Sequence, residues 1–263
     1  IILLNGRITK KTLRRWLIFP TFAKSLFKKF EICFSSSLES KKYLKRLGAE
    51  NIKYIGNLKF SQSENEDLKL HKRLRNFIKS NNSWCASSTH YNEEKFCGQT
   101  HIKLSKKYEN LLTIIIPRHI GRAKSIQNEL NNLNLKVHLD EPKKKISPDT
   151  NIYLVNSYGK TKSFYKECKN VFLGGSMINH GGQNPLEAVR YGCKVFHGPN
   201  VSNFKEIYDF LKNKRLSKKI TNYSGLANLL NITFKKKNHP KQISQSLYLI
   251  GKNILNKTYK EIC

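Results

Sequence analysis

The stretch GGSMINHGGQNPLE, from Gly174 to Glu187, constrains the fold of this chain more than any other feature of its sequence. An apolar run at 171–173 leads directly into it, and an apolar pattern typical of a helix follows Pro185. Paired glycines let the backbone adopt positive φ and approach other groups closely, while Asn184 is a favourable N-cap and proline suits a first helical turn. We therefore predict a strand, a glycine-lined loop and a helix N-terminus whose N–H groups suit a phosphate.

Glu187 falls within the first turn of this predicted helix. Its carboxylate can accept hydrogen bonds from hydroxyl groups, which is what the recognition of a sugar requires. A loop that only joins a strand to a helix would contain similar glycines, so the neighbouring sequence has to distinguish a binding site from a simple connection.

Polar clusters follow several other apolar runs in the second half of the chain, each just after a predicted strand. They are Ser87–His90, Pro117–His119, the turn at Gly159, the opening stretch itself and Gly198–Pro199. In an open parallel sheet, ligands bind outside the carboxyl ends of the strands. The convergence of these clusters on one edge therefore predicts a binding site there.

The alternation of apolar runs with helical patterns predicts an α/β fold. We expect strands at 1–4, 32–34, 52–55, 84–86, 111–116, near 137, and at 152–155, 171–173 and 195–196. We expect helices at 9–30 with an interruption at Pro20, then at 37–47, 67–79, 93–107, 124–133, 159–168, 203–211 with Asn203 as its cap, 223–234 and 241–262. The polar, turn-rich segment 56–66 predicts a boundary between a domain at 1–60 and a domain at 61–240, with 241–263 as a terminal helix that packs back on the first domain.

The charge of the chain is extreme, with 49 Lys and Arg against 18 Asp and Glu and a net charge of +31. Nucleic-acid binding, contact with an anionic membrane surface and a general enrichment in lysine would each explain it. The lysines are spread along the whole chain. This favours general enrichment over the concentrated basic stripe of a nucleic-acid-binding protein.

Residues 1–30 contain eight Lys or Arg and no acidic residue, interleaved with leucines and aromatic residues. Basic and aromatic residues at helical spacing suit a helix that lies on a membrane surface. An ordinary amphipathic helix that packs its aromatic side chains into the core would show the same spacing. Both interpretations stay open at this point.

The six cysteines form no CxxC pair, and most lie in or beside apolar runs. We expect reduced, buried thiols and no zinc site. No apolar segment approaches the ~18–20 residues needed to cross a bilayer. The chain opens on IILLNGR without an initiating Met, so we expect a further N-terminal part upstream.

Six motifs occur in the order of one known family: NGRIT at 5–9, GNLKF at 56–60, ASSTHYNEE at 86–94, PRH at 117–119, GGSMINHGGQNPLEA at 174–188 and GPNVSNFKEI at 198–207. The chain resembles the 3-deoxy-D-manno-octulosonic acid (Kdo) transferases of bacterial lipopolysaccharide biosynthesis. The resemblance implies an α/β fold of the GT-B type, with two Rossmann-like, doubly wound domains, the first of them incomplete in this chain. It implies inverting transfer of Kdo from CMP-Kdo to the lipid A precursor lipid IVA, with no cofactor or bound metal.

The same resemblance implies the location and the site residues. The enzyme would work at the cytoplasmic face of the bacterial inner membrane, as a peripheral protein or anchored through an upstream segment. It would contact CMP-Kdo, the lipid A precursor and an anionic membrane surface, and no nucleic acid. The implied donor-binding residues are Arg118, His119, Gly159, Lys160, Gly181, Gly182, Gln183, Asn184 and Glu187. Ser88, Thr89, His90, Ser176 and Asn203 would line the cleft, and Asn5 and Arg7 would lie on the acceptor side.

Two features depart from the family pattern. Lys160 stands where the family usually carries an acidic residue, and a lysine can bind a phosphate but cannot accept a hydrogen bond from a hydroxyl or amino group. The catalytic carboxylate of the family belongs to the early N-terminal domain, so we expect the general base upstream of Ile1 and no catalytic residue within this chain. Inverting transfer needs such a base. Glu93 and Glu94 open a predicted helix, where acidic residues suit the helix dipole.

Two alternatives remain open. The HGGQNPLE element also fits other GT-B glycosyltransferases that use nucleotide-sugars. A basic nucleic-acid-binding protein, a different class, is favoured only by the charge and would require a basic stripe with stacking aromatic residues.

Overall fold

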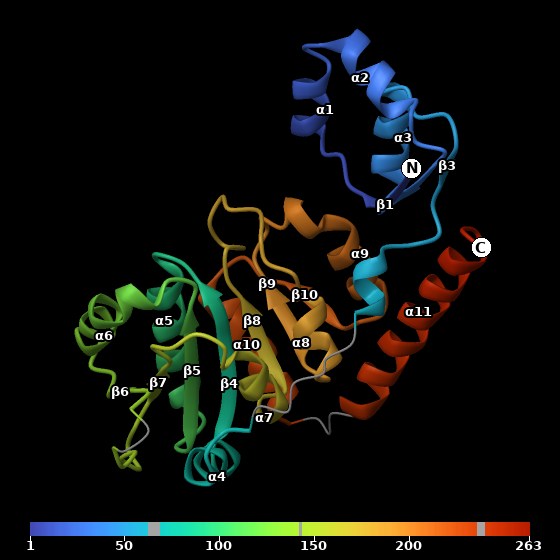
Figure 1. Ribbon diagram of the computed structural model, residues 1–263. Coiled ribbons are helices and arrows are strands. Elements are labelled where there is room, and N and C mark those ends of the chain that lie inside the picture. Colours follow the sequence, from blue (N-terminus) through green and yellow to red (C-terminus); the bar gives the residue numbers. More distant parts are fainter. Residues whose placement is uncertain (63–68, 142–143, 236–239) are drawn as a thin grey trace. The chain divides into compact units, whose positions relative to one another are not determined.

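A computed structural model describes residues 1–62, 69–141, 144–235 and 240–263 (Figure 1). The chain divides into two compact units, one formed by 1–64 together with 246–263 and the other by 65–245. Each unit contains its own sheet, and every strand pairing found within the described ranges is parallel. The predicted α/β class with parallel sheets is confirmed.

The smaller unit has a three-stranded sheet in the order β1–β2–β3. Its strands are β1 (Ile2–Gly6), β2 (Ile32–Ser35) and β3 (Ile52–Lys53), and its helices are α1 (Lys10–Trp16), α2 (Pro20–Phe27), α3 (Leu38–Arg46) and the 3-10 turn η1 (Leu58–Ser61). Pro20 begins α2, where proline is well tolerated because the first N–H groups of a helix have no intrahelical partner. The predicted interruption at Pro20 therefore separates two helices.

Apolar side chains of all three α-helices meet on the sheet of this unit, among them Ala23, Phe27, Leu44 and Leu47. Gly48 ends α3 with a φ of +103°, and a Cβ there would lie 2.9 Å from the Cα of Lys24. Glycine is thus required both by the left-handed backbone and by the close approach of α2.

The long helix α11 (Pro240–Lys260) supplies its second half to the smaller unit. A Cβ on Gly251 would lie 2.2 Å from the carbonyl oxygen of Phe60, so α11 packs directly against the backbone of η1. Ile254 packs beside Gly56, and Lys53 forms an ion pair with Glu261. These contacts tie the C-terminal residues to the segment that follows β3.

The larger unit has a seven-stranded sheet in the order β10–β9–β8–β4–β5–β7–β6. The strands are β4 (Asn82–Thr89), β5 (Leu111–Pro117), β6 (Val137–Leu139), β7 (Ile152–Leu154), β8 (Asn170–Leu173), β9 (Lys194–His197) and β10 (Ser217–Lys219). The helices are α4 (Lys72–Ser80), α5 (Glu93–Ser105), α6 (Ala123–Asn131), α7 (Thr161–Glu167), α8 (Leu186–Arg190), α9 (Lys205–Asn213) and α10 (Tyr223–Phe234), with 3-10 turns η2 (Ile120–Arg122) and η3 (Ser202–Phe204).

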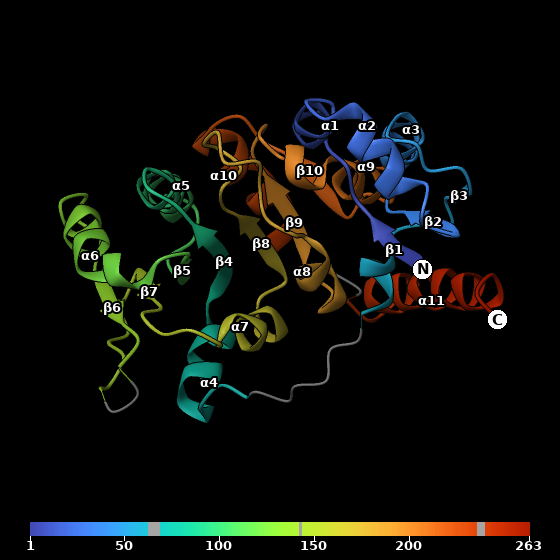
Figure 2. The ribbon, with the colours of Figure 1, turned by 45° about the horizontal axis from the view of Figure 1, so that its top comes forward.

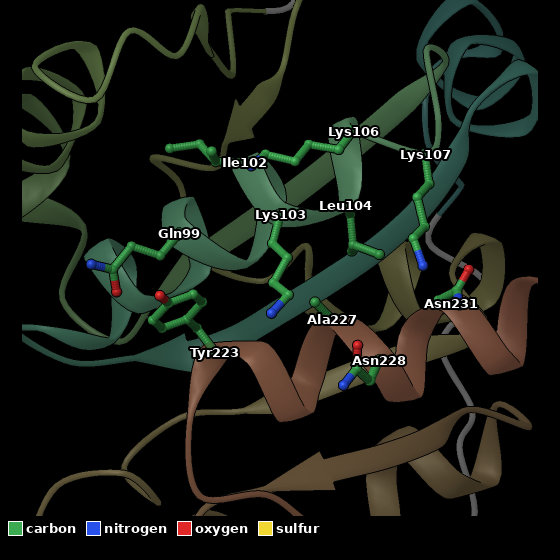
Figure 3. Close-up of a pocket in the computed structure, with 10 residues that line it drawn as sticks. All are labelled: Gln99, Ile102, Lys103, Leu104, Lys106, Lys107, Tyr223, Ala227, Asn228 and Asn231. Atoms are coloured by element: carbon green, nitrogen blue, oxygen red, sulfur yellow. The ribbon is translucent and has the colours of Figure 1, made fainter.

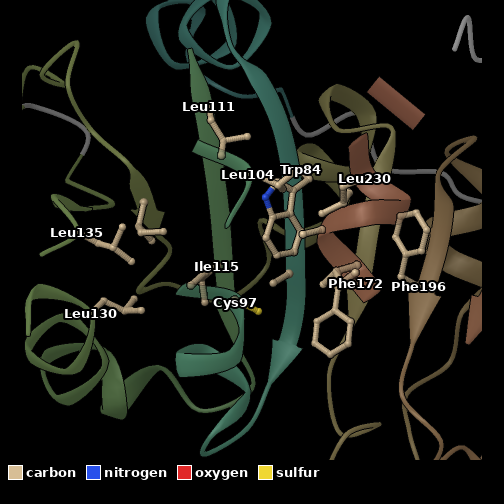
Figure 4. Close-up of a cluster of buried hydrophobic side chains, with 14 of the residues drawn as sticks. Trp84, Cys97, Leu104, Leu111, Ile115, Leu130, Leu135, Phe172, Phe196 and Leu230 are labelled. Atoms are coloured by element: carbon tan, nitrogen blue, oxygen red, sulfur yellow. The ribbon is translucent and has the colours of Figure 1, made fainter. Parts of the chain in front are cut away.

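Helices cover both faces of this sheet, with α5, α6 and α10 on one face and α4, α7 and α8 on the other (Figure 2). Strand β5 is buried along its whole length, as expected for a central parallel strand. The core under α5, α6 and α10 is built from large apolar side chains, including Trp84, Leu104, Leu130, Phe172 and Leu230 (Figure 4).

The strand order reverses between β4 and β8. From β4 the chain builds outward through β5 to β6 and β7, and it then returns to place β8 on the other side of β4. Loops that leave adjacent strands in opposite directions open a crevice at such a switch point, which is where ligands bind in doubly wound folds. We therefore expect a binding site at the loops after β4 and β8.

Several predictions about elements need correction. The helix predicted from Asn203 begins at Lys205, because Ser202–Phe204 forms a 3-10 turn and Asn203 is not its cap. The helix of the opening stretch begins at Leu186 with Pro185 as its N-cap residue, one position later than predicted, and is only five residues long. Strand β10 was not predicted, because two of its three residues are lysines. The predicted helix start at Asp67 and part of the predicted boundary at 56–66 lie outside the described residues.

No helix within the described ranges is both long enough and apolar enough to cross a membrane.

Candidate functional site

Four side chains gather at the carboxyl end of the large sheet, around the switch point. His90 follows β4, Arg118 and His119 follow β5, and His180 follows β8. The ring centroid of His90 lies 4.4 Å from that of His180 and 5.9 Å from that of His119. We call His90, Arg118, His119 and His180 the strand-end cluster.

His90 lies at the centre of this cluster. Its Nε2 atom is buried and has no hydrogen-bond partner in the described part of the chain. Burial, together with the positive charges of His180, His119, Arg118 and Arg122, lowers the pKa of His90 to about 4. The imidazole is therefore neutral near pH 7 and can exchange a hydrogen bond with a bound ligand.

Arg118 supplies the exposed positive charge of the cluster. Its backbone N–H donates to the carbonyl oxygen of Thr89 at 2.9 Å, which fixes the loop after β5 to the end of β4. The side chain is exposed, and its guanidinium forms no ion pair within the described ranges. His119 is exposed beside it. A guanidinium in this state can bind a phosphate or carboxylate through two parallel hydrogen bonds.

The loop after β8 binds a carboxylate of the protein itself. The backbone N–H groups of Gly175, Ser176 and Met177 donate to the carboxylate of Glu93 at 2.7, 3.1 and 2.9 Å. The N–H of His90 also donates to Glu93, at 3.0 Å. The N–H groups of Gly175, Ser176 and Met177 are thus already occupied, and that of Gly174 donates to the carbonyl oxygen of Ser87 at 2.9 Å, so this part of the loop offers none of these groups to a phosphate.

The second glycine pair is held by the loop after β9. Gly181 and Gly182 have φ values of +97° and +76°, and a Cβ on Gly181 would lie 2.4 Å from the side-chain amide of Asn203. The N–H of Asn203 donates to the carbonyl oxygen of Gly181 at 3.0 Å, and its side chain donates to that of His180 at 3.1 Å. Asn203 therefore shapes the loop that carries His180.

The residues that follow this pair lead into the short helix α8. The Oδ1 of Asn184 accepts a hydrogen bond from the N–H of Leu186 at 3.2 Å. The carbonyl oxygen of Gln183 accepts one from the hydroxyl of the buried Tyr208 at 3.0 Å. Glu187 is half-buried in the first turn of α8.

Lys160 forms an ion pair with Asp140, with 2.6 Å between Nζ and Oδ2. Asp140 is buried, and it also accepts hydrogen bonds from Tyr153 at 2.6 Å and from Ser157 at 3.2 Å. The lysine that replaces the acidic residue of the family pattern is thus held by a carboxylate from the end of β6. Gly159, before it, is exposed with a φ of +83°.

The other residues of the predicted cleft have mainly structural contacts. Ser88 has a positive φ of +56°, Thr89 is buried, and the hydroxyl of Ser176 donates to the carbonyl oxygen of Leu173 at 2.5 Å. In the smaller unit, the Oδ1 of Asn5 accepts a hydrogen bond from the N–H of Leu58 at 3.0 Å, and Arg7 is exposed.

Sequence reasoning missed Glu93 as a site residue, because its position at a helix start gave a sufficient explanation. Its carboxylate is instead the centre of the loop structure, while Glu94 accepts two hydrogen bonds from Arg122, at 3.1 and 3.2 Å. The sequence signal for such an arrangement is a carboxylate three residues after a strand-end histidine, combined with a GGS loop elsewhere in the chain.

Two hollows have no lining residue in common with the strand-end cluster. A groove of about 410 Å³ runs between α5 and α10, where the side chain of Lys103 reaches towards α10 (Figure 3). A second hollow, of about 610 Å³, lies between α4, the loop after β6 and the start of α7, and Lys160 is among its lining residues. Within the described ranges, no three His, Cys, Asp or Glu side chains are grouped so that they could hold a metal ion.

Comparison with known proteins relates the chain to one family. Residues 1–62 match the family model described as 3-deoxy-D-manno-octulosonic-acid transferase (kdotransferase). A 3-deoxy-D-manno-octulosonic acid transferase of Haemophilus influenzae is 27% identical over 80% of this chain and 50% of its own length. A bifunctional glycosyltransferase/methyltransferase of Fusobacterium nucleatum is 27% identical over 98% of this chain and 41% of its own length. The chain thus spans about half the length of these relatives.

Among solved structures, the C-terminal CMP-Kdo binding domain of WaaA from Acinetobacter baumannii superimposes with a TM-score of 0.58 at 22% identity. The match covers 68% of this chain and 91% of that domain, and at this identity it speaks for the fold alone. The sequence matches agree with the resemblance to the Kdo transferases that the motifs indicated, and the structural match agrees with the predicted fold.

Proposed function

We propose that this chain, a relative of the Kdo transferases, binds CMP-Kdo at the strand-end cluster of its larger unit and takes part in the transfer of Kdo to a lipid A precursor. The observation that carries the proposal is the combination of an exposed guanidinium, Arg118, with the neutral imidazole of His90 at the switch point of a doubly wound sheet. This is where such folds bind nucleotides.

The anionic part of the donor would bind to Arg118. The N–H groups of Gly175, Ser176 and Met177 are taken by Glu93, which leaves the guanidinium of Arg118 and the side chains of His119 and His180 as the positive or donating groups of the strand-end cluster. The Nε2 of His90 would exchange a hydrogen bond with the same ligand, because a buried polar atom without a partner is costly. Glu187 would accept hydrogen bonds from the ribose hydroxyls, and Gly159, Gly181, Gly182, Gln183 and Asn184 would shape the donor pocket.

The proposed reaction is a substitution at the anomeric carbon of Kdo. The acceptor hydroxyl oxygen forms the new bond on one face while the bond to the phosphate oxygen of CMP breaks on the other, which inverts the centre. The leaving phosphate takes the electron pair, and Arg118 stabilises the negative charge that develops on it. We assign no metal or cofactor to this step, since a guanidinium can supply the positive charge; full activity in excess EDTA would agree with that assignment.

The acceptor proton needs a base, and neither acidic residue beside the cluster is suited to the role. Glu93 accepts four backbone hydrogen bonds, and Glu94 binds the guanidinium of Arg122. Both carboxylates are thus already bound by hydrogen-bond donors of the protein itself, which leaves neither of them free to receive the proton of the acceptor hydroxyl. We therefore place neither of them in the proton transfer.

The partner on the acceptor side would be an anionic membrane that contains the lipid acceptor, in keeping with action at the cytoplasmic face of the inner membrane. Ile18 and Phe19, in the turn between α1 and α2, and Phe22, in the first turn of α2, are 67%, 67% and 60% exposed. Four basic residues, Lys10, Lys11, Arg14 and Arg15, line a groove beside Ile18. Exposed apolar residues next to cations suit an interface of lipid tails and anionic headgroups.

Calorimetric titration with nucleotides tests the proposed donor. The chain should bind CMP more tightly than UMP or UDP, since the proposal requires a cytidine nucleotide. Tighter binding of UDP would instead support the alternative of a different nucleotide-sugar transferase. Tighter binding of single-stranded DNA than of any mononucleotide would support the nucleic-acid-binding alternative.

A further inference from the structure

We propose that Glu93 is a positioning residue of the donor site, an internal anion that fills the backbone nest of Gly175–Met177 and thereby holds His90 and His180 in contact. This inference rests on the proposed function for its effect on donor binding, while its effect on the loop can be measured without a ligand. Glu93 does not itself contact the donor in this account.

The carboxylate of Glu93 uses both of its oxygens fully. Oε2 accepts from the N–H groups of His90 and Gly175, and Oε1 accepts from those of Ser176 and Met177. The side chain is only 1% exposed. Burying a charge is costly unless it is compensated, and here four N–H dipoles converge on it in place of a cation. The position therefore requires a negative charge, and a neutral side chain of the same shape cannot replace it.

These four bonds connect the loops after two different strands. The N–H of His90 belongs to the loop after β4, and the other three belong to the loop after β8. Gly174 allows the two loops to meet, because a Cβ there would lie 2.4 Å from the carbonyl oxygen of Ser88 and 2.8 Å from Glu93 itself. His90, whose N–H is one of the four donors, also contacts His180, with 4.4 Å between the ring centroids.

The junction extends to a third loop through Ser176. Its N–H is bonded to Glu93, its hydroxyl accepts a hydrogen bond from the N–H of Gly198 at 2.8 Å, and its carbonyl oxygen accepts one from the N–H of Asn200 at 2.9 Å. The loop after β9 in turn carries Asn203, which binds the backbone of His180 and Gly181. One buried carboxylate thus fixes the ends of β4, β8 and β9 relative to one another.

The test compares Glu93→Gln with Glu94→Gln. Both substitutions neutralise a fully buried carboxylate in the first turn of α5, so both should lower stability. Only Glu93→Gln turns an amide group towards two N–H donors of the nest. We expect Glu93→Gln to accelerate hydrogen exchange at Gly175, Ser176 and Met177 and to weaken CMP binding by about tenfold or more, since bonds to a charged group contribute strongly. Glu94→Gln should leave both quantities close to those of the unmodified chain.

Equal CMP affinity for Glu93→Gln and the unmodified chain would overturn the proposal, and so would an equal loss of affinity in Glu94→Gln. If the unmodified chain binds no CMP, the proposed function fails, but hydrogen exchange and the contact between the His90 and His180 rings still test the role of Glu93. Should Glu93→Gln fold poorly, Glu93→Asp replaces it. That variant keeps the charge on a shorter side chain and should show a smaller acceleration of exchange in the same three residues; unchanged exchange there would count against the proposal.

Discussion

Arg118 combines two properties that a phosphate-binding residue needs, an exposed guanidinium and a backbone fixed to the neighbouring strand by its bond to Thr89. A charge-assisted hydrogen bond contributes roughly 1.5–3 kcal/mol. We expect Arg118→Ala to lower the affinity for CMP by about tenfold or more in calorimetric titration. Lys106→Ala is the control, because it removes the same charge from the groove between α5 and α10. An equal loss of CMP affinity in the two variants would mean that the net charge of the chain, and not a contact with Arg118, determines the affinity.

A substitution at Glu187 distinguishes a role in donor binding from a role in catalysis. Its place in the first turn of α8, beside the second glycine pair, suits an acceptor for the ribose hydroxyls. Glu187→Gln keeps the shape and removes the charge, so we expect weaker donor binding with kcat changed little. If Glu187 were the general base, the same substitution would lower kcat by roughly 10²–10⁴ and leave donor affinity unchanged. Steady-state kinetics of the complete enzyme distinguish the two results.

His101 gives the fold a dependence on acid. It is buried on α5 beside Thr113, with 2.9 Å between Nδ1 and Oγ1, and burial lowers its pKa from 6.5 to about 4. As the pH falls, His101 is therefore protonated in the unfolded chain before it is protonated in the folded chain. The contribution of neutral His101 to the free energy of unfolding is complete above pH 6.5 and is lost as the pH falls through 4. The loss amounts to about 3 kcal/mol at most. Urea unfolding near pH 7 and near pH 4.5 should show this drop, and His101→Gln should reduce it.

Some site residues could be predicted from sequence, and others could not, for a physical reason. The position of Arg118 and His90 at strand ends was predictable because each follows an apolar run. The contacts of Glu93 and Asn203 could not be predicted, since their partners lie 82 positions away for Gly175 and 23 for His180. The ion pair of Lys160 with Asp140 also depends on the pairing of β6 with β7, which a short and weakly apolar strand does not reveal.

At the scale of elements, residues 1–30 show features of both interpretations left open for them. Leu13 and Phe27 pack into the core, as an ordinary amphipathic helix requires, but Ile18, Phe19 and Phe22 remain exposed. Helical spacing alone could not predict which of these apolar side chains are exposed. The chain breaks at Pro20, and the apolar face of α2 therefore points in a different direction from that of α1.

We therefore expect the turn to bind anionic vesicles. Each Lys or Arg near such a surface contributes about 1 kcal/mol. Binding in co-sedimentation should rise with the fraction of anionic lipid and fall with salt. The double variant Phe19→Ser/Phe22→Ser should bind less, while Tyr248→Ser/Leu249→Ser, which removes exposed apolar side chains from α11, should bind like the unmodified chain. Equal binding to neutral vesicles would contradict the electrostatic part of this expectation.

Short elements were the hardest to predict. Strand β5 is long and apolar, and its predicted position at 111–116 agrees with the observed one. Strand β4 was predicted only over its apolar centre at 84–86 and is longer than this at both ends. Strand β10 contains two exposed lysines and is recognised only through its pairing with β9. Helix α8 is much shorter than a glycine loop followed by an apolar pattern suggests, because Gly192, with a φ of +77°, follows soon after it. Its brevity limits any contribution of a helix dipole to phosphate binding.

At the scale of the whole molecule, the chain divides into two parallel-sheet units, and the larger unit carries the strand-end cluster. The class of this fold was predictable because βαβ patterning recurs along the chain. The arrangement of the strands was not, since the order β5–β7–β6 requires β7 to insert between two strands that precede it in sequence.

The central claim, that CMP binds at the strand-end cluster, is tested most directly by following the histidine ring signals of the chain in NMR during a titration with CMP. We predict that the signals of His90, His119 and His180 shift together and saturate at one ligand concentration. His101, which is buried under α5 and away from the strand ends, should not move. Saturable binding that shifts none of these three rings would contradict the account, as would an absence of any CMP-dependent change.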